Sequence, residues 1–324
     1  MLKENKYFSE PFSNKDIFTQ ISKSFGIRLT EFDPTTQFFQ DIVASLQFEF
    51  TTKIVNKLKE IQNKNKFDYL YYSGGCALNI RTNTALSESN IFKNIFIPPC
   101  CDDTGLSIGA AAFFEWHKNR NPIKVHSPFL NNYKIEHNEF SYSKKTIIEL
   151  SKLLLQNKII GICNGFGEVG PRGLGNRSII ALPFSKELKN KISMRMKGRE
   201  WYRPLAPIML EKNAKAITGL KKISVAAKYM LYEFKILNSY QQKLEGIIHI
   251  NGTARIQILF DAKESPFMYD LLSYLDKKHS VPCLINTSFN KCNEPIVQTS
   301  EDAIKSANDL GIEYLIINGK IKRL

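Results

Sequence analysis

The sequence has little of what marks membrane spans, zinc sites or disulfide frameworks. No apolar run approaches the roughly 18 residues that a membrane-spanning helix needs. The polar start, MLKENKYFSEPFSNKD, lacks the apolar core of a signal peptide. The six cysteines are scattered without CxxC spacing, which argues against a zinc site and against a disulfide framework. We therefore expect a cytoplasmic protein with reduced thiols and no membrane partner.

Histidine is also scarce, with five residues in a chain of 324 and no HxxxH pair. The net charge of +14 raises the question of nucleic acid or an acidic ligand as a partner. Lysine and asparagine are abundant along the whole chain, and no block of five or more basic residues occurs. This pattern favours a biased base composition over a nucleic-acid surface, so nucleic acid is not the expected partner.

The first third of the chain alternates between helical and strand-like segments, which indicates an α/β layer with its loops at one sheet edge. Apolar residues at helical spacing predict a long amphipathic helix. The expected elements are a helix over 35–62, a buried strand within 67–75, a helix over 76–86, a strand over 94–99 and a helix over 104–118.

A polar stretch over 121–140, rich in proline and asparagine, is expected to link this part to a second, mixed α and β unit. The expected domains are therefore 1–120 and 141–324, an α/β and α+β fold overall. In the second domain we expect strands over 157–165, 245–250, 281–286 and 312–318, with helices near 185–197, 266–278 and 300–310.

The stretch SGGCALN, residues 73–79, joins an expected strand to an expected helix. Its glycines let the backbone approach a ligand closely, and a helix start offers unpaired amide donors to an anion. This predicts a nucleotide-phosphate site at Gly74, Gly75 and Asn79. A tight turn without any ligand needs the same glycines, so both interpretations stand.

Two adjacent aspartates, Asp102 and Asp103, precede a helix rich in small residues. One carboxylate can cap the helix, which stabilises it by about 1 kcal/mol. Asp103 is then a candidate metal ligand, because hard cations take carboxylate oxygens. A complete site needs more ligands than this sequence indicates.

Arginine is concentrated in one part of a chain that otherwise uses lysine. Of ten arginines, five lie between 172 and 203, namely Arg172, Arg177, Arg195, Arg199 and Arg203. The first two lie in a loop studded with glycine, residues 165–178. Such loops expose amides, and guanidinium groups bind phosphate and carboxylate oxygens in pairs. The pattern predicts phosphate binding, with surface solubilisation as the alternative.

In LINTSFN, residues 284–290, Ser288 and Asn290 follow an expected strand. If the strand continues, the two side chains lie on one side, where a hydroxyl and an amide can bind one ligand together. A serine or asparagine turn is the simpler alternative.

Seven segments, in the same order, resemble the carbamoyltransferase family that includes nodulation-factor and antibiotic O-carbamoyltransferases. They are FQDIVASLQ, YYSGGCALN, PPCCDDTGLSIGAAA, GPRGLGNRSI, MKGREWYRPLAP, IIHINGTARIQ and PCLINTSFNKCNEPIV. The resemblance implies the C-terminal half of an actin-like ATPase domain in 1–120 and a YrdC-like domain in 141–324. It further implies that carbamoyl phosphate and ATP form carbamoyl-adenylate and that the carbamoyl group passes to a hydroxyl of a sugar or natural product.

The resemblance also implies roles for individual residues. The family's KxR and SxN signature corresponds to Lys197 with Arg199 and Ser288 with Asn290, the expected catalytic set. Carbamoyl phosphate and nucleotide, with Mg²⁺, are expected to bind at the candidates Arg172, Arg177, Arg203, Thr253 and Arg255 in matching segments. Asn251 replaces the usual family aspartate, so a charge is lost near the expected adenylate pocket.

The resemblance implies that the chain begins inside the family's first domain. The histidine pair that would join Asp103 in binding Fe²⁺ is then expected from a partner chain. That partner, or self-association, is also expected to cover apolar faces of the helices at 35–62 and 104–117. Two further hypotheses remain, a tRNA-binding enzyme of the carbamoyl-adenylate type and a catalytically silent remnant.

Overall fold

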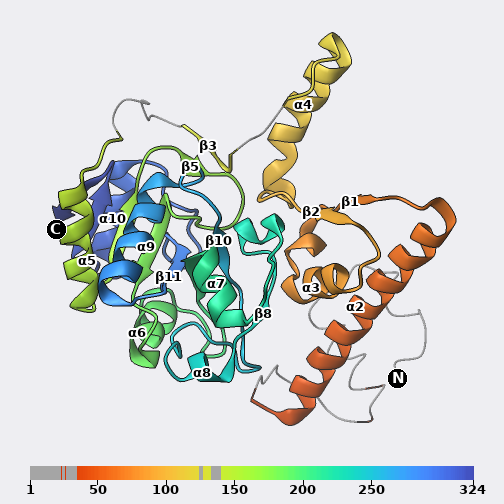
Figure 1. Cartoon of the computed structure of the whole chain (residues 1–324), viewed down its shortest axis with the longest axis horizontal. Helices are drawn as coiled ribbons and strands as arrows, with labels where there is room; N and C mark the ends of the chain where they lie inside the picture. Colours follow the sequence, from red (N-terminus) through yellow and green to blue (C-terminus); the bar gives the residue numbers. More distant parts are fainter. Residues whose placement is uncertain (1–22, 24–25, 27–34, 124–126, 133–139) are drawn as a thin grey trace. The chain divides into compact units, whose positions relative to one another are not determined.

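The computed structural model of the protein describes residues 23, 26, 35–123, 127–132 and 140–324 (Figure 1). The chain divides into two compact units, residues 1–57 and 58–324, and the division falls within helix α2 (Gln37–Asn65). All other elements given below belong to the second unit. In the part of the chain that the structure describes, no helix is long and apolar enough to cross a membrane.

Helix α2 confirms the helix expected over 35–62. It ends at Asn65, and the next residue, Lys66, has a φ of 53°, a left-handed conformation that stops the helix. Several of its apolar side chains are exposed, among them Val43, Leu46 and Phe48.

A small α/β segment follows, in the order that the sequence predicts. Its elements are β1 (Tyr69–Tyr71), η1 (Gly75–Leu78), α3 (Ile80–Glu88), β2 (Asn94–Phe96), η2 (Asp103–Gly105) and α4 (Leu106–Asn119). Strands β1 and β2 pair in parallel. The expectation of a buried strand is wrong for β1, because Tyr69 is 63% exposed and Tyr71 is 79% exposed. An aromatic run signals apolar character but not which face is covered.

Helix α4 has no buried residue along its length. Its exposed apolar side chains include Leu106, Phe113, Phe114 and Trp116. Monomeric proteins rarely expose large contiguous apolar patches. The expectation that a partner or a second copy covers this face stays a prediction.

The remainder of the second unit is built on a seven-stranded mixed sheet in the order β10–β7–β11–β6–β4–β12–β13. The β10–β7 and β4–β12 pairs are parallel, and the other neighbours are antiparallel. The strands are β4 (Ile160–Cys163), β6 (Arg177–Ala181), β7 (Ala206–Leu210), β10 (Gln257–Leu259), β11 (Cys283–Ser288), β12 (Tyr314–Ile317) and β13 (Lys320–Arg323). The mixed α and β character predicted for this part is confirmed.

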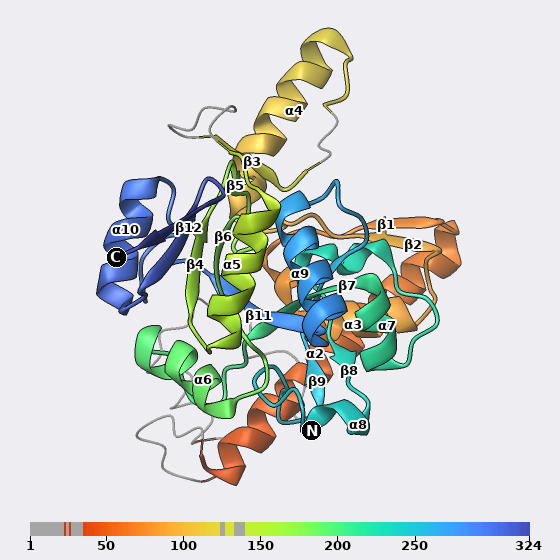
Figure 2. The same cartoon turned by 60° about the vertical axis from the view of Figure 1, so that its left-hand side comes forward.

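Helices pack against this sheet, and α5 and α9 lie beside each other (Figure 2). Buried apolar residues of the strands and helices form one continuous core. The helical elements are α5 (Lys144–Leu155), α6 (Lys186–Asn190), η4 (Lys191–Met196), α7 (Glu211–Thr218), η5 (Val225–Tyr229), α8 (Asn238–Gln241), α9 (Pro266–His279) and α10 (Ser300–Leu310). The helices expected near 185–197, 266–278 and 300–310 are confirmed.

The strand expected over 245–250 is wrong, because that apolar run forms turns. Gly246 N donates to the Pro183 carbonyl at 2.9 Å, and Ile247 is fully buried. Burial therefore explains the apolar run without any strand. Two short strands flank it, β8 (Phe234–Lys235) and β9 (Thr253–Ala254), which pair antiparallel.

The stretch expected to be a linker, 121–140, contains a short strand in its described part. Strand β3 (Phe129–Asn131) pairs antiparallel with β5 (Gly167–Glu168), the start of the glycine loop. Residues 124–126 and 133–139 of this stretch lie outside the described residues. The domain boundaries at 120 and 141 stay predictions.

Candidate functional site

A buried lysine joins the two segments that the KxR and SxN signature singles out. Lys197 Nζ donates to Ser288 Oγ at 3.1 Å and to Asn290 Oδ1 at 2.8 Å, and it also contacts the Ser288 carbonyl oxygen. Ser288 Oγ in turn donates to Asn290 Oδ1 at 2.7 Å. Three residues that are up to 93 positions apart therefore share one hydrogen-bonded group.

The backbone before Lys197 is unusual. Element η4 is a π-helical turn that continues α6, and Lys197 N donates to the carbonyl of Ile192, five residues earlier. Gly198 then adopts a φ of 56°, where a side chain would be strained. This turn directs the lysine toward the end of β11.

Lys197 is only 2% exposed. Burial, and after it the positive charge of Arg199, lowers the pKa of Lys197 to about 6. Its three acceptor oxygens match the three hydrogens of an ammonium group. At pH 7 the lysine is thus mainly neutral, and a negative charge nearby would favour its protonated form.

Three arginines lie within electrostatic reach of one another, one of them next to this lysine, and none has an ion pair to any residue that the structure describes. They are Arg172, Arg199 and Arg255, and each has a pKa lowered first by burial. Arg172 and Arg199 lower the pKa of Arg255 further, to about 9. Nε of Arg172 and Nε of Arg255 are buried and have no hydrogen-bond partner in the part of the chain that the structure describes. We call Arg172, Lys197, Arg199 and Arg255 the cationic cluster.

Two more contacts define the edge of the cationic cluster. Arg199 donates to Thr287 Oγ1 at 3.3 Å, next to Ser288 on β11. Arg203 pairs with Glu200 at 3.1 Å and is about half exposed. The positive charge of Arg203 lowers the pKa of Arg199, so it lies within electrostatic reach of the cluster.

The glycine loop is folded around a buried carboxylate that the sequence did not single out. Glu168 Oε1 accepts from the backbone N–H groups of Leu174, Asn176 and Arg177 at 2.7–3.0 Å. An added Cβ at Gly173 would lie 2.8 Å from the Ser288 Cα, so the loop rests directly on the end of β11. In the sequence, the signal for Glu168 was a carboxylate within a glycine-rich loop. This signal does not distinguish a buried acceptor from a solvent-exposed charge.

Arg177 serves the loop itself in this structure. Its guanidinium donates five hydrogen bonds, all to the main-chain carbonyls of Asn164, Gly165, Asn176 and Gln298. The side chain is 2% exposed. These bonds occupy the donors that a phosphate would need, whereas the donors of Arg172 and Arg255 are not all used.

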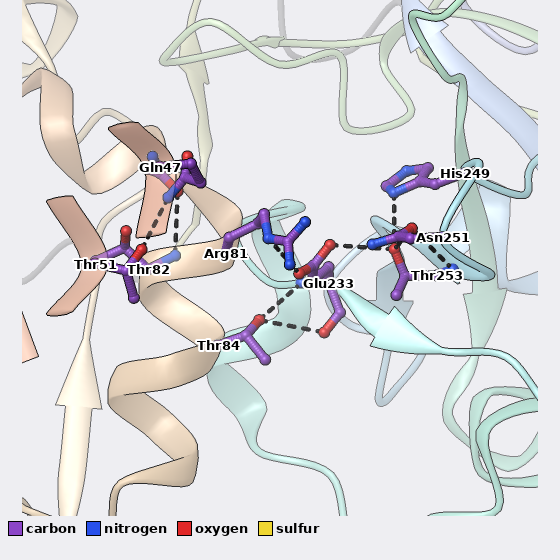
Figure 3. Close-up of polar contacts among 10 residues, drawn as sticks. Gln47, Thr51, Arg81, Thr82, Thr84, Glu233, His249, Asn251 and Thr253 are labelled. Atoms are coloured by element: carbon purple, nitrogen blue, oxygen red, sulfur yellow. Dashed lines mark hydrogen bonds and ion pairs between the residues drawn. The ribbon is translucent and has the colours of Figure 1, made fainter. Parts of the chain in front are cut away.

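Thr253 belongs to a polar network with His249, Asn251 and Glu233 (Figure 3). Its hydroxyl contacts Glu233 Oε2 at 3.1 Å, Asn251 Oδ1 at 2.8 Å and His249 Nδ1 at 2.9 Å. Glu233 also pairs with Arg81 of α3 at 3.5 Å. His249 and Glu233 were missed by sequence reasoning, because neither is part of the signature.

The glycine turn at 74–75 shapes the loop before α3. Gly74 has a φ of 98°, and its N–H donates to the Cys101 carbonyl. Asn79 caps α3 by accepting from Thr82 N at 3.1 Å. These roles fit the tight-turn alternative, and phosphate binding at Gly74, Gly75 and Asn79 stays a prediction.

The two aspartates divide their roles as the sequence predicts. Asp102 Oδ1 accepts from Thr104 N at 3.2 Å and caps η2, while Asp103 is exposed. Among the described residues, no three histidine, cysteine or carboxylate side chains are grouped as metal ligands. The described residues therefore do not fit an iron site by themselves. His126 and His137 lie outside them.

The Asp102 loop nevertheless lies near the cationic cluster. An added Cβ at Gly170 would lie 2.3 Å from the Pro99 carbonyl oxygen, so the two backbones touch. Cys101 and Asp102 are the residues whose charges act on Arg172.

The neighbouring pocket is distinct from the cluster. It has a volume of about 250 Å³ and is lined by Leu174, Tyr229, Gln257 and Glu264 among others. None of the four cationic side chains lines it. Chemically, the cluster offers many donors for anionic oxygens, and this feature, rather than the pocket, defines the candidate site.

Two family descriptions match the sequence. "Carbamoyltransferase C-terminus" matches residues 151–323, and "Carbamoyltransferase N-terminus" matches residues 5–112. The first match covers more than half of the chain and contains the whole cationic cluster.

Among curated proteins, "Nodulation protein NolO" of Bradyrhizobium diazoefficiens is 31% identical over 299 residues, which cover 88% of this chain and 54% of the relative. "Nodulation protein U" of Azorhizobium caulinodans is 31% identical over 263 residues, covering 77% of this chain and 45% of the relative. The chain thus spans about half the length of the curated relatives that it matches.

Among solved structures, "full-length HypF in the phosphate- and nucleotide-bound form" aligns with 57% of this chain and 24% of its own. The TM-score is 0.36 and the identity is 16%.

Proposed function

Because the chain belongs to the carbamoyltransferase family, we propose that its cationic cluster activates a carbamoyl group with ATP for transfer to a hydroxyl. The observation that carries the proposal is the concentration of Arg172, Arg199 and Arg255, without ion pairs among the described residues, around a lysine bound to Ser288 and Asn290. Holding such charges together costs free energy, which an anionic ligand recovers.

In the proposed reaction, hydrolysis of carbamoyl phosphate releases phosphate and leaves carbamate. A carbamate oxygen then bonds to the α-phosphorus of ATP, while the bond from that phosphorus to the bridging oxygen breaks. Pyrophosphate leaves with Mg²⁺, and carbamoyl-adenylate remains. The arginines neutralise charge on the phosphate oxygens, where preorganised donors lower the barrier most.

The second half-reaction passes the carbamoyl group on. The oxygen of an acceptor hydroxyl bonds to the carbamoyl carbon, the bond from carbon to the adenylate oxygen breaks, and AMP leaves with the hydroxyl proton transferred to solvent. We propose a small-molecule acceptor such as a sugar or natural product. The support for this acceptor class is that two relatives are named as nodulation proteins.

Pyrophosphate release tests the first half-reaction. The protein is incubated with ATP, carbamoyl phosphate and Mg²⁺, and release is compared with that of Lys197→Ala and Arg199→Ala. Losing one charge-assisted contact costs about 1.5–3 kcal/mol, or roughly 10- to 150-fold in rate. Lys322→Ala, an exposed lysine on the edge strand β13, is the matched control and should be unchanged. Equal release by all four proteins would contradict the proposal.

Iron enters this proposal only through additional ligands. Asp103 is a single exposed carboxylate, so we propose that Fe²⁺ binding needs histidines from a partner chain. Metal analysis of the purified chain should then find essentially no stoichiometric iron. One iron per chain, bound tightly without a partner, would refute this part.

A further inference from the structure

His249 is held in a closed turn beside Thr253. Gly252 N donates to the His249 carbonyl at 3.0 Å, and His249 N donates to the Thr253 carbonyl at 2.8 Å. Gly252 has a φ of 75°, which this turn requires and which glycine adopts without strain. The turn places His249 Nδ1 2.9 Å from Thr253 Oγ1 (Figure 3).

The partners of the Thr253 hydroxyl determine which nitrogen of His249 carries the proton. Glu233 Oε2 and Asn251 Oδ1 can only accept from this hydroxyl. A hydroxyl hydrogen directed at His249 Nδ1 would leave both of these oxygens facing the hydroxyl oxygen without a hydrogen, so the favoured orientation is toward one of the two. His249 Nδ1 must then be the donor to Thr253 Oγ1, because an acceptor there would face an oxygen without a hydrogen.

A neutral imidazole with its proton on Nδ1 has a lone pair on Nε2. His249 is neutral at pH 7, because burial lowers its pKa to about 4, assisted by the charges of Arg255, Lys189 and Arg81. Its Nε2 is buried and has no hydrogen-bond partner in the described chain. The structure thus holds a buried acceptor that no group of the described residues satisfies.

This acceptor adjoins the cationic cluster through Arg255. Arg255 lies two residues after Thr253, the spacing that puts two side chains on one face of an extended backbone. Its Nε is also buried without a partner, and its charge acts on His249. His249 therefore stands at the edge of the proposed phosphate site.

The cationic cluster supplies donors in excess and almost no free acceptor. Arginine side chains only donate, and so does a protonated lysine, the form of Lys197 that an anionic ligand stabilises. The oxygens of Ser288, Asn290 and Thr287 already accept from Lys197 and Arg199. A ligand with phosphate oxygens is well served there, but a ligand that also carries an N–H group needs an acceptor.

We propose that His249 Nε2 accepts a hydrogen bond from the amide nitrogen of the carbamoyl group, and that it selects carbamoyl phosphate over analogues without that N–H. Glu233 and Asn251 are the positioning residues, because they accept the Thr253 hydroxyl hydrogen and leave the hydroxyl oxygen to accept from the imidazole. The inference rests on the proposed function, since it assumes that a carbamoyl compound binds at the cluster.

Acetyl phosphate is the discriminating probe, because a methyl group replaces the amide nitrogen at nearly the same size. A site that bonds a substrate N–H rejects the analogue that lacks it, since the buried acceptor is left unpaired. Calorimetric titration of the full chain with carbamoyl phosphate, acetyl phosphate and inorganic phosphate measures the preference directly. We expect carbamoyl phosphate to bind at least about tenfold more tightly than acetyl phosphate.

Two substitutions of one residue separate the two ring nitrogens. The amide of His249→Asn reaches the position of Nδ1 and can still contact Thr253, but it has no group at the position of Nε2. The longer side chain of His249→Gln places an oxygen near the position of Nε2. We expect the preference to vanish in His249→Asn, with affinity for acetyl phosphate unchanged, and to be retained in part by His249→Gln.

The outcomes distinguish this inference from the proposed function. If the wild-type chain binds both acyl phosphates equally, or if His249→Asn keeps the preference, the inference is wrong and the proposed function stands. If the wild-type chain binds none of the three phosphates, the proposed function fails and the inference fails with it.

The positioning role of Glu233 and Asn251 has a spectroscopic signature. Nitrogen NMR of the five histidines reports which ring nitrogen is protonated, and His249→Asn assigns the signal. We expect the Nδ1–H form in the wild type and a shift toward the Nε2–H form in the double variant Glu233→Leu with Asn251→Leu, which removes both acceptors of the Thr253 hydroxyl. Arg81→Met removes the ion pair to Glu233 and one of the charges that lower the pKa of His249, but it leaves every partner of the Thr253 hydroxyl in place, so it should keep the Nδ1–H form. An Nε2–H form in the wild type would overturn the proposal.

Discussion

Binding of an anion at the cationic cluster should take up a proton on Lys197. With a pKa of about 6, this lysine is about one-tenth protonated at pH 7. An opposite charge within a few ångströms raises such a pKa by roughly 1–3 units, to between about 7 and 9. The protonated fraction then rises to between about one-half and nearly one, so we expect an uptake of about 0.4–0.9 proton per ligand.

The choice of pH 7 isolates this lysine from its titrating neighbours. Arg255, with a pKa of about 9, stays protonated, and His249, with a pKa of about 4, stays neutral. The sign of the pH dependence follows from the raised pKa in the complex. The affinity for the anion is greatest below pH 6, where Lys197 is protonated in the free protein. As the pH rises, the affinity falls by up to about tenfold per pH unit until the pH exceeds the pKa of Lys197 in the complex.

Calorimetry in buffers of different ionisation enthalpy measures this proton uptake. Sulfate is a suitable probe because it mimics phosphate and does not itself titrate in this range. In Lys197→Arg the charge is permanent, so the uptake should fall to near zero while binding persists. An uptake below about 0.2 proton in the wild type, or an equal uptake in Lys197→Arg, would refute the reasoning.

Three further predictions concern the loop and the polar network. Arg177→Met should lower the free energy of unfolding by about 3–5 kcal/mol, because four main-chain carbonyl groups, one of them fully buried, lose a buried charged donor; an unchanged urea midpoint would contradict this. Glu168→Gln should lower the free energy of unfolding by about 1–2 kcal/mol, because three hydrogen bonds from backbone N–H groups to a carboxylate become bonds to a neutral amide. Urea titration measures this loss too, and an equal free energy of unfolding in wild type and variant would show that the negative charge of Glu168 does not stabilise the loop. Asn251→Asp should keep both bonds to Thr253 and raise the pKa of His249 from about 4, because a carboxylate is added nearby. Proton NMR titration measures this pKa, and no upward shift would exclude the assumed proximity.

Periodicity and apolar runs correctly predicted those elements in which the apolar residues are buried and also form a regular strand or helix. Strands β4, β11 and β12 and helices α9 and α10 follow such runs closely. The failure at 245–250 has a physical reason, since Ile247 is buried by a turn and an apolar run reports burial rather than backbone conformation.

The candidate site could be named in part from its signature but not assembled. Lys197 and Ser288 are 91 residues apart, and nothing in local sequence shows that they meet. Glu168 and Glu233 resemble solvated carboxylates in the sequence. Their importance depends on backbone amides and a hydroxyl that only the folded chain brings to them.

The π-helical turn before Lys197 makes the site depend on chain length as well as on residue identity. An α-helix rotates by about 100° per residue, and a π-turn accommodates one residue more than an α-turn. Removing a single residue from Lys191–Met196, for example the exposed Met194, would let the α-helical register continue. The Lys197 side chain would then point away from β11, although the sequence would keep every strand and every charged residue of the cluster. In an alignment, a related chain with a gap in this turn can therefore retain the lysine in its sequence without holding it next to β11.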